Sequence, residues 1–182
     1  MTARADAYRE IQTPDLERRV ADMIRIGTIS HTDYSDPAAP RVRVQYGENT
    51  TGWLPWAPKR AGRSRTWEPL KVGEQVIIAS PSGDLAQGVV FGSLNYNDRP
   101  APANGAHETV TEWDGGIRES VDDDGNEYTL TVPAGGMIRL SVGGTSLEMK
   151  SDHIKLTIGA TTLELRADGT TLTTPQFQGV QS

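Results

Sequence analysis

Hydrophobic and polar residues alternate along the last third of the chain in a pattern that repeats. Residues 137–152 (MIRLSVGGTSLEMKSD) are followed at once by residues 153–168 (HIKLTIGATTLELRAD), and seven of the sixteen aligned positions are identical. Cut into blocks of eight, the stretch has apolar residues at every second position, as strands with one buried face do. Small or acidic pairs end each block and predict tight turns. The pattern predicts a stack of short strands.

A stack of this kind cannot enclose a core by itself, because each strand offers only two or three apolar side chains on one face. A single-chain solenoid needs longer coils and capping elements. We therefore expect three copies of the chain to wind about one axis through interchain strand pairing, with the apolar residues meeting on that axis. The predicted trimer core consists of Ile138, Leu140, Val142, Leu147, Met149, Ile154, Leu156, Ile158, Leu163, Leu165 and Leu172.

A different alternation precedes this stretch. Five short strand candidates, separated by Pro, Gly, Asp and Asn clusters, occupy residues 23–31, 41–47, 51–56, 74–80 and 87–94. Five short strands in so few residues favour a small barrel of the OB type, with an SH3-like barrel as the alternative.

The remaining segments complete an all-β plan. Residues 1–22 predict an N-terminal arm or short helix, in which Thr13 can cap and Pro14 suits the first turn. Residues 23–97 form the barrel, and residues 98–106 (DRPAPANGA) form a linker. Residues 107–182, named here the needle, carry the repeat and the tip.

Composition narrows the function classes. The chain has no cysteine, which excludes disulfides and thiolate metal sites, and its net charge of −6 argues against nucleic acid as a partner. It has no apolar run long enough to span a membrane, and its polar start is unlike a signal peptide. We expect synthesis in the bacterial cytoplasm without a signal peptide.

Three segments in this order resemble a known family: residues 25–56 (RIGTISHTDYSDPAAPRVRVQYGENTTGWLPW), 70–94 (LKVGEQVIIASPSGDLAQGVVFGSL) and 114–140 (DGGIRESVDDDGNEYTLTVPAGGMIRL). They are similar to the central spike of contractile tails, the baseplate assembly protein V family of contractile phages and R-type bacteriocins. The resemblance covers nearly the whole chain.

The resemblance implies a homotrimer with an OB-type barrel followed by an intertwined trimeric β-helix. The barrel would dock under the tail hub protein, and the needle would pierce the target outer membrane when the sheath contracts. The protein would be a virion or bacteriocin component of an extracellular particle. The function would be mechanical, without catalytic or cofactor-binding residues.

The tip departs from the family. Several relatives bind iron there through a His-x-His motif, but the last 29 residues of this chain contain no histidine. We expect no tip iron and no other metal. Phe177 and Val180 are the candidate residues that close the tip, and a separate tip protein is the alternative.

Other candidate sites are weaker. Lys59, Arg60, Arg63 and Arg65 lie in one stretch and form a candidate hub-docking loop, with a solvated loop as the alternative. Residues 122–127 (DDDGNE) lack the flanking ligands of an EF-hand and predict a hairpin turn instead.

Two alternative functions are an enzyme that degrades surface polysaccharide and a carbohydrate-binding trimeric β-solenoid. The first needs paired carboxylates, for which the recurring Glu148 and Glu164 are the candidates. A binding module for carbohydrate or oligonucleotide would use barrel aromatics such as Trp53 and Trp56.

Overall fold

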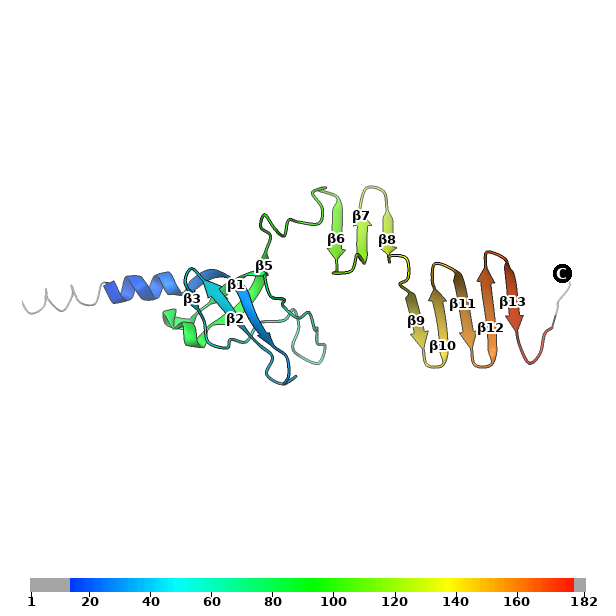
Figure 1. Cartoon of the computed structure of the whole chain (residues 1–182), viewed down its shortest axis with the longest axis horizontal. Helices are drawn as coiled ribbons and strands as arrows, with labels where there is room; N and C mark the ends of the chain where they lie inside the picture. Colours follow the sequence, from blue (N-terminus) through cyan, green and yellow to red (C-terminus); the bar gives the residue numbers. More distant parts are fainter. Residues whose placement is uncertain (1–13, 179–182) are drawn as a thin grey trace, which may run out of the picture. The chain divides into compact units, whose positions relative to one another are not determined.

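The computed structural model describes residues 14–178 and divides the chain into two compact units (Figure 1). The division falls between Ala101 and Pro102, inside the segment that the sequence predicts as a linker. Apart from a helix at residues 14–22 and two short 3-10 turns, the regular structure of the described residues is β. The chain is therefore an all-β protein, as expected.

The first unit contains one five-stranded antiparallel sheet. Its strands are joined in the order β3-β2-β1-β4-β5, so that β1 lies at the centre. The 3-10 turns η1 (Pro81–Gly83) and η2 (Leu85–Gln87) connect β4 to β5. The strands are β1 (Ile24–Asp33), β2 (Arg41–Tyr46), β3 (Asn49–Thr50), β4 (Gln75–Ala79) and β5 (Val89–Leu94).

Residues 51–57 close this sheet into a barrel. Leu54 and Val42 exchange two backbone hydrogen bonds of 2.9 Å, and on the other side Val90 N–H donates to Pro55 O at 2.9 Å. The prediction of a regular strand at residues 51–56 was wrong, because Pro55 has no N–H to donate and the segment makes only isolated bridges. It still joins β2 to β5, which is what a closed barrel needs.

The barrel core comes from alternate positions of these strands. The backbones of β1 and β2 approach each other closely at Gly27, where a Cβ atom would lie 2.5 Å from the carbonyl oxygen of Gln45. Any larger residue there would push β1 away from β2. The fully buried apolar residues are Ile29, Val42, Val44, Leu54, Val76, Ile78 and Val90.

The helix at residues 14–22 is fixed to the barrel by polar contacts. The Arg19 guanidinium donates to the carbonyl oxygen of Ser82 at 2.9 Å. Asp22 is 7% exposed and accepts from Arg25 Nε at 2.8 Å. The expected short helix is thus present over these residues, and the earlier part of the arm, with Thr13, lies outside the described residues.

The second unit begins with a three-stranded antiparallel meander of β6 (Glu108–Glu112), β7 (Arg118–Asp122) and β8 (Glu127–Thr131). The Asp122 carboxylate accepts the backbone N–H groups of Asp124 and Gly125, both at 3.0 Å. These bonds fold residues 122–127 into the hairpin turn that the sequence predicts.

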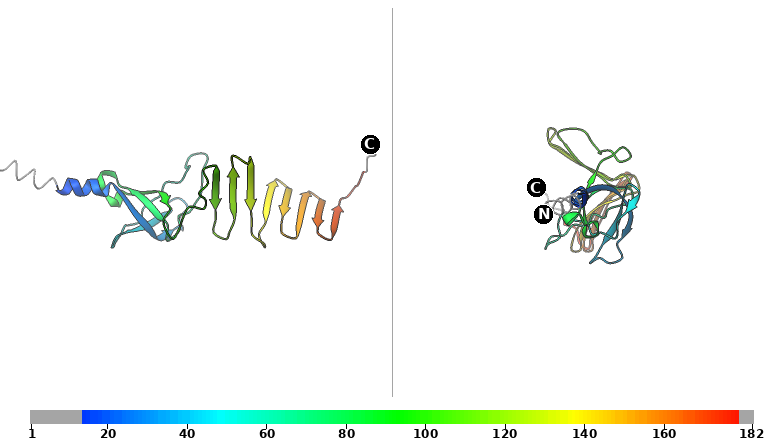
Figure 2. Two further views of the ribbon diagram at one scale, coloured as in Figure 1. Left: turned by 90° about the horizontal axis from the view of Figure 1, so that it is seen from above. Right: turned by 90° about the vertical axis from the view of Figure 1, so that its left-hand side faces the viewer.

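A five-stranded antiparallel meander follows, and each of its strands falls inside one of the predicted eight-residue blocks. Gly143 and Gly159 take up positive φ values of 57° in the equivalent turns of the repeat, where other residues would be strained. Figure 2 shows the strands following one another in chain order. They are β9 (Ile138–Val142), β10 (Thr145–Met149), β11 (His153–Ile158), β12 (Thr161–Arg166) and β13 (Gly169–Thr173), and are called the needle sheet below.

The backbone pairing of the needle sheet differs from the expected winding. Each strand pairs with its neighbour in the same chain, in the order β13-β12-β11-β10-β9, whereas the sequence analysis expected pairing between chains. The turns contain only two or three residues, so consecutive strands of one chain meet before any other strand can reach them. Within the needle sheet, only the outer edges of β9 and β13 have no partner strand among the described residues.

Candidate functional site

One face of the needle sheet carries all the apolar residues predicted for the trimer core. Residues that are opposite each other in neighbouring strands share a face, and so do alternate residues along a strand. The register pairs Met149 with Ile138 and Ile154, and it pairs Ile158 with Thr145. The eleven predicted core residues therefore lie on one side of one sheet.

Leucine fills the middle row of this face in every strand. The register places the five leucines opposite one another, from one edge of the sheet to the other. The two flanking rows consist of Ile, Val, Met and Thr together with Leu165, and the β-branched residues among them suit a sheet surface. The middle row consists of Leu140, Leu147, Leu156, Leu163 and Leu172.

This apolar face is uncovered in the single chain. Leu140 and Ile158 are each 63% exposed, and Val142 is 83% exposed. Exposed apolar patches that extend over several strands mark interaction surfaces. The face therefore needs a partner, and a row of leucines without polar gaps needs an apolar one.

The opposite face carries a ladder of alternating charges. The register sets Arg139, Glu148, Lys155 and Glu164 side by side across four strands. Glu148 pairs with Arg139 and, at 3.0 Å, with Lys150, and the Arg166 guanidinium reaches Glu164 at 2.6 Å. The ladder stabilises the strand order and marks this face as the one exposed to water.

These ion pairs fix the ionisation of the two glutamates. Hydrogen bonds from Arg139 and then Lys150 lower the pKa of Glu148 from 4.5 to about 2. A hydrogen bond from Arg166 likewise lowers the pKa of Glu164. A glycosidase needs one carboxyl group with a raised pKa to act as the acid. The glutamates that recur in the repeat therefore do not support the polysaccharide-degrading alternative.

The lowered pKa of Glu148 predicts an acid-sensitive sheet. The folded form binds the Glu148 proton more weakly than the unfolded form, so the stabilisation is fully present above pH 4.5 and is lost as the pH falls toward about 2. We expect the melting temperature of the second unit to fall over this range, and to fall less in Glu148→Gln. Thermal melts followed by circular dichroism test this, with Glu48→Gln in the barrel as the control. An equal acid response in both variants would contradict it.

His153 lies on the charged face, as its position beside Ile154 predicts, but it does not reach freely into solvent. Its side chain is 10% exposed, with Nδ1 2.8 Å from Asp152 Oδ1 and Nε2 3.4 Å from Glu148 Oε1. Neighbouring acidic side chains therefore cover it.

The tip residues follow β13 directly. The Thr174 hydroxyl donates to the carbonyl oxygen of Gln176 at 2.8 Å and lies 3.2 Å from the hydroxyl of Thr161. Phe177 is 75% exposed, and the predicted tip residue Val180 lies outside the described residues. Residues 174–178 contain no histidine or carboxylate, so they offer none of the ligands that a tip iron of the kind implied by the resemblance would need.

The candidate docking loop lies in the first unit, between the segment that closes the barrel and β4. Lys59 pairs with Glu68 at 3.0 Å. Arg60, Arg63 and Arg65 are exposed, and no acidic side chain of the described residues pairs with them. The loop therefore presents uncompensated positive charge on a chain whose net charge is negative.

An aromatic cluster beside this loop was missed by the sequence analysis, which singled out Trp53 and Trp56. Trp53 instead lies under the guanidinium of Arg43, and the distance from the Arg43 Cζ atom to the centroid of the Trp53 ring is 4.7 Å. Trp56 packs against Tyr34 and Trp67, with ring centroids 5.4 and 5.6 Å away. The one available signal was the three tryptophans that flank the basic stretch.

No helix among residues 14–178 is long and apolar enough to cross a membrane. In the same range, no three histidine or acidic side chains gather in a way that could hold a metal ion.

Comparison with known proteins adds two findings. Residues 25–95 match the family of type VI secretion system and phage-baseplate injector OB domains. The chain is also similar to the spike protein of Escherichia phage P2, with 44% identity over 89 residues. That alignment covers 49% of this chain and 41% of the P2 protein.

The barrel, its closing segment and its core all lie within the matched residues, which decides between the OB-type and SH3-like barrels. Residues 25–95 therefore form an injector OB domain of the type VI secretion system and phage-baseplate family, and the chain resembles a phage baseplate spike over about half of its length.

Proposed function

We propose that this chain forms the central membrane-piercing spike of a contractile injection machine, and that it acts as a homotrimer. The observation that carries the proposal is the uncovered apolar face of the needle sheet, with leucine in the middle row of all five strands. Three such faces, turned toward one axis, would bury each other and leave the three charged faces in water.

The width of the sheet favours three copies. Strands of five or six residues are about 18 Å long. In a triangular prism with sides of about 18 Å, the centre of each face lies about 5 Å from the axis, which is half the usual separation of about 10 Å between packed sheets. The leucine row would then fill the axis, and the flanking rows would meet at the corners.

A prism of this kind suits a mechanical task. Its strands cross the axis and stack at about 4.8 Å, so that backbone hydrogen bonds run along the direction of thrust. The spike would be made in the bacterial cytoplasm, join an extracellular phage tail or bacteriocin particle, and be driven through the target outer membrane by sheath contraction. The P2 relative is itself named a spike protein, which supports this role.

The barrel would attach the spike to the rest of the baseplate. In this proposal the basic loop with Lys59, Arg60, Arg63 and Arg65 docks on the tail hub protein. Its uncompensated arginines support an acidic partner surface.

The assembly is tested by measuring the mass of the purified chain in solution. We expect size-exclusion chromatography with light scattering to give three times 19.7 kDa and an elongated particle. Electron microscopy of particles labelled on this chain should place it at the centre of the baseplate. A monomer at micromolar concentration, or a label elsewhere in the tail, would overturn the proposal.

The tip would be closed by an apolar plug. Leu172 is the last residue of the leucine row, and Pro175, two residues after β13, has no N–H group with which to continue the strand pairing. Three copies of Phe177 would then converge on the axis and cover the end of the core.

We expect Phe177→Ser to lower the melting temperature of the trimer by several °C without dissociating it, because three buried phenyl groups contribute several kcal/mol. Gln178→Ser is the matched control and should melt like the parent. Differential scanning calorimetry measures both, and metal analysis of the trimer should find no stoichiometric iron. An unchanged melting temperature in Phe177→Ser, or one iron ion per trimer, would contradict the proposal that Phe177 closes the tip.

A further inference from the structure

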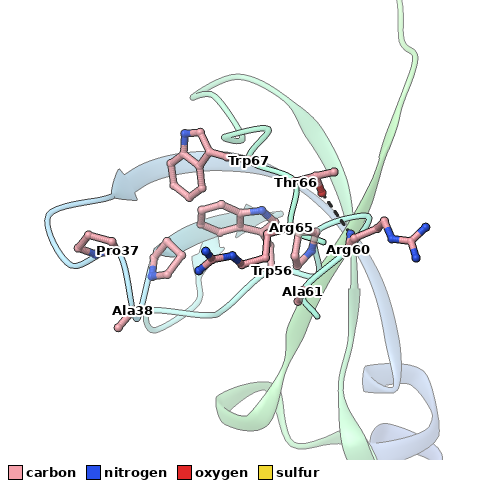
Figure 3. A pocket seen from close by; sticks show the side chains of 10 residues that line it. Pro37, Ala38, Trp56, Arg60, Ala61, Arg65, Thr66 and Trp67 are labelled. Carbon is pink, nitrogen blue, oxygen red and sulfur yellow. Dashed lines mark hydrogen bonds between the residues drawn. The ribbon is translucent and has the colours of Figure 1, made fainter. Parts of the chain in front are cut away.

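A pocket of about 520 Å³ lies on the barrel between two loops, which come from residues 37–40 and 56–67. Pro37 and Ala38 stand at one end of it and Arg60 at the other, with the indole rings of Trp56 and Trp67 between them (Figure 3). Pockets of about 300–1,000 Å³ hold most small ligands and short peptide segments. The volume is therefore adequate for a specific ligand.

The walls of the pocket are aromatic rings and prolines. Tyr34 meets Trp56 and Trp67 edge to face, each with ring centroids 5.4 Å apart, and the two indoles lie 5.6 Å apart. Trp67 remains 57% exposed, so this cluster has a free surface. Pro37, Pro40 and Pro58 complete the lining.

Both loops are held in place without a ligand. Thr66 N–H donates to Arg60 O at 3.0 Å, and Arg60 N–H donates to the Thr66 hydroxyl at 3.1 Å, which closes the basic loop. In the other loop, Asp36 accepts the N–H of Ala38 through its carboxylate at 2.8 Å. The Tyr34 hydroxyl donates to the carbonyl oxygen of Leu70. A ligand would thus bind a pre-formed pocket, at little cost in ordering.

The polar groups of the pocket are donors. Arg60 and Arg65 line it and have no acidic partner among the described residues. The described lining contains no carboxylate or carboxamide, and the Thr66 hydroxyl already accepts from Arg60 N–H. The pocket therefore suits a ligand that brings acceptors and negative charge together with an apolar body.

We propose that this pocket binds an extended, acidic, proline-containing segment of another protein. Aromatic grooves bind extended proline-rich segments, whose rings pack on the indoles at low entropic cost. Carboxylates at the ends of such a segment would reach Arg60 and Arg65. A neutral sugar fits less well, because its hydroxyls also need acceptors. The inference deepens the docking role proposed above by naming the chemistry of the partner.

Isothermal titration calorimetry of the purified full chain tests the proposal. The probe is a short synthetic peptide in which aspartates alternate with prolines. Two further peptides carry asparagine in place of aspartate or alanine in place of proline. We expect measurable binding of the first peptide, weakened by added salt, and at least about tenfold weaker binding of the other two.

Variants locate the site. Trp67→Ala and Arg65→Gln should each weaken binding at least about tenfold. Arg99→Gln removes the same charge from the same unit, outside both the docking loop and the pocket lining. Trp113→Ala removes a tryptophan from the other unit, and both variants should bind like the parent. Circular dichroism confirms that each variant is folded.

The outcomes separate this inference from the spike proposal, because the titration needs no particle. Absent binding, equal binding by Trp67→Ala and Arg99→Gln, or tighter binding of oligothymidylate than of the acidic peptide would overturn the peptide site and leave the trimeric spike untouched. Specific peptide binding by a chain that is monomeric in solution would support the peptide site and contradict the proposal of a trimeric spike.

Discussion

Replacing Leu156 by aspartate is expected to prevent the chain from assembling into a trimer. Leu156 lies at the centre of the needle sheet, opposite Leu147 on one side and Leu163 on the other. In the proposed prism, three carboxylates would face one another at one level of a dry core. Burying an unpaired carboxylate costs several kcal/mol, and the three charges also repel one another.

The matched control for this variant is Thr157→Asp. Thr157 is the next residue of β11 and lies on the charged face, opposite Ser146 and Thr162, so the same charge would enter water there. Lys155→Asp would be a poorer control, because it would set a third carboxylate between Glu148 and Glu164.

Light scattering compares the two variants. We expect a mass of 19.7 kDa, or aggregates, for Leu156→Asp and three times that mass for Thr157→Asp. A trimer in both would show that the apolar face is not the interface.

When the two units are produced as separate fragments, we expect the second unit to assemble into a trimer and the first unit to fold without assembling. The fragment of residues 102–182 should be trimeric and resistant to heat and detergent, because its apolar face has no other cover. The fragment of residues 1–101 should fold alone, since its buried core of seven apolar residues lies entirely within it.

The barrel fragment should be monomeric at micromolar concentration. Ile24 and Ile26 are 66% and 55% exposed on the outside of β1, so weak association is expected only at high concentration. In the full chain, tethering to a trimeric needle would raise the local concentration of barrels into the millimolar range. A monomeric needle fragment together with a trimeric barrel fragment would reverse the proposed division of roles.

Periodicity allowed much of the strand plan to be predicted. A period of two is a local property, and it placed β1, β2, β4 and β5 and the five strands of the needle sheet close to their observed bounds. The change of phase at each turn likewise predicted that the eleven core candidates share one face. A strand pattern does not state its partner, however, and pairing within the chain instead of between chains emerged only from the short turns of the folded sheet.

The sequence by itself therefore determined the elements, the two faces of the repeat and the resemblance to a spike. The tertiary structure decided the features that depend on residues far apart along the chain. Residues 51–57 close the barrel although Pro55 weakens their strand pattern, because β2 and β5 lie on either side of them. Tyr34 joins Trp56 and Trp67 only because the barrel brings their loops together. Local patterns fix which side chains are buried, whereas long-range contacts fix what they are buried against.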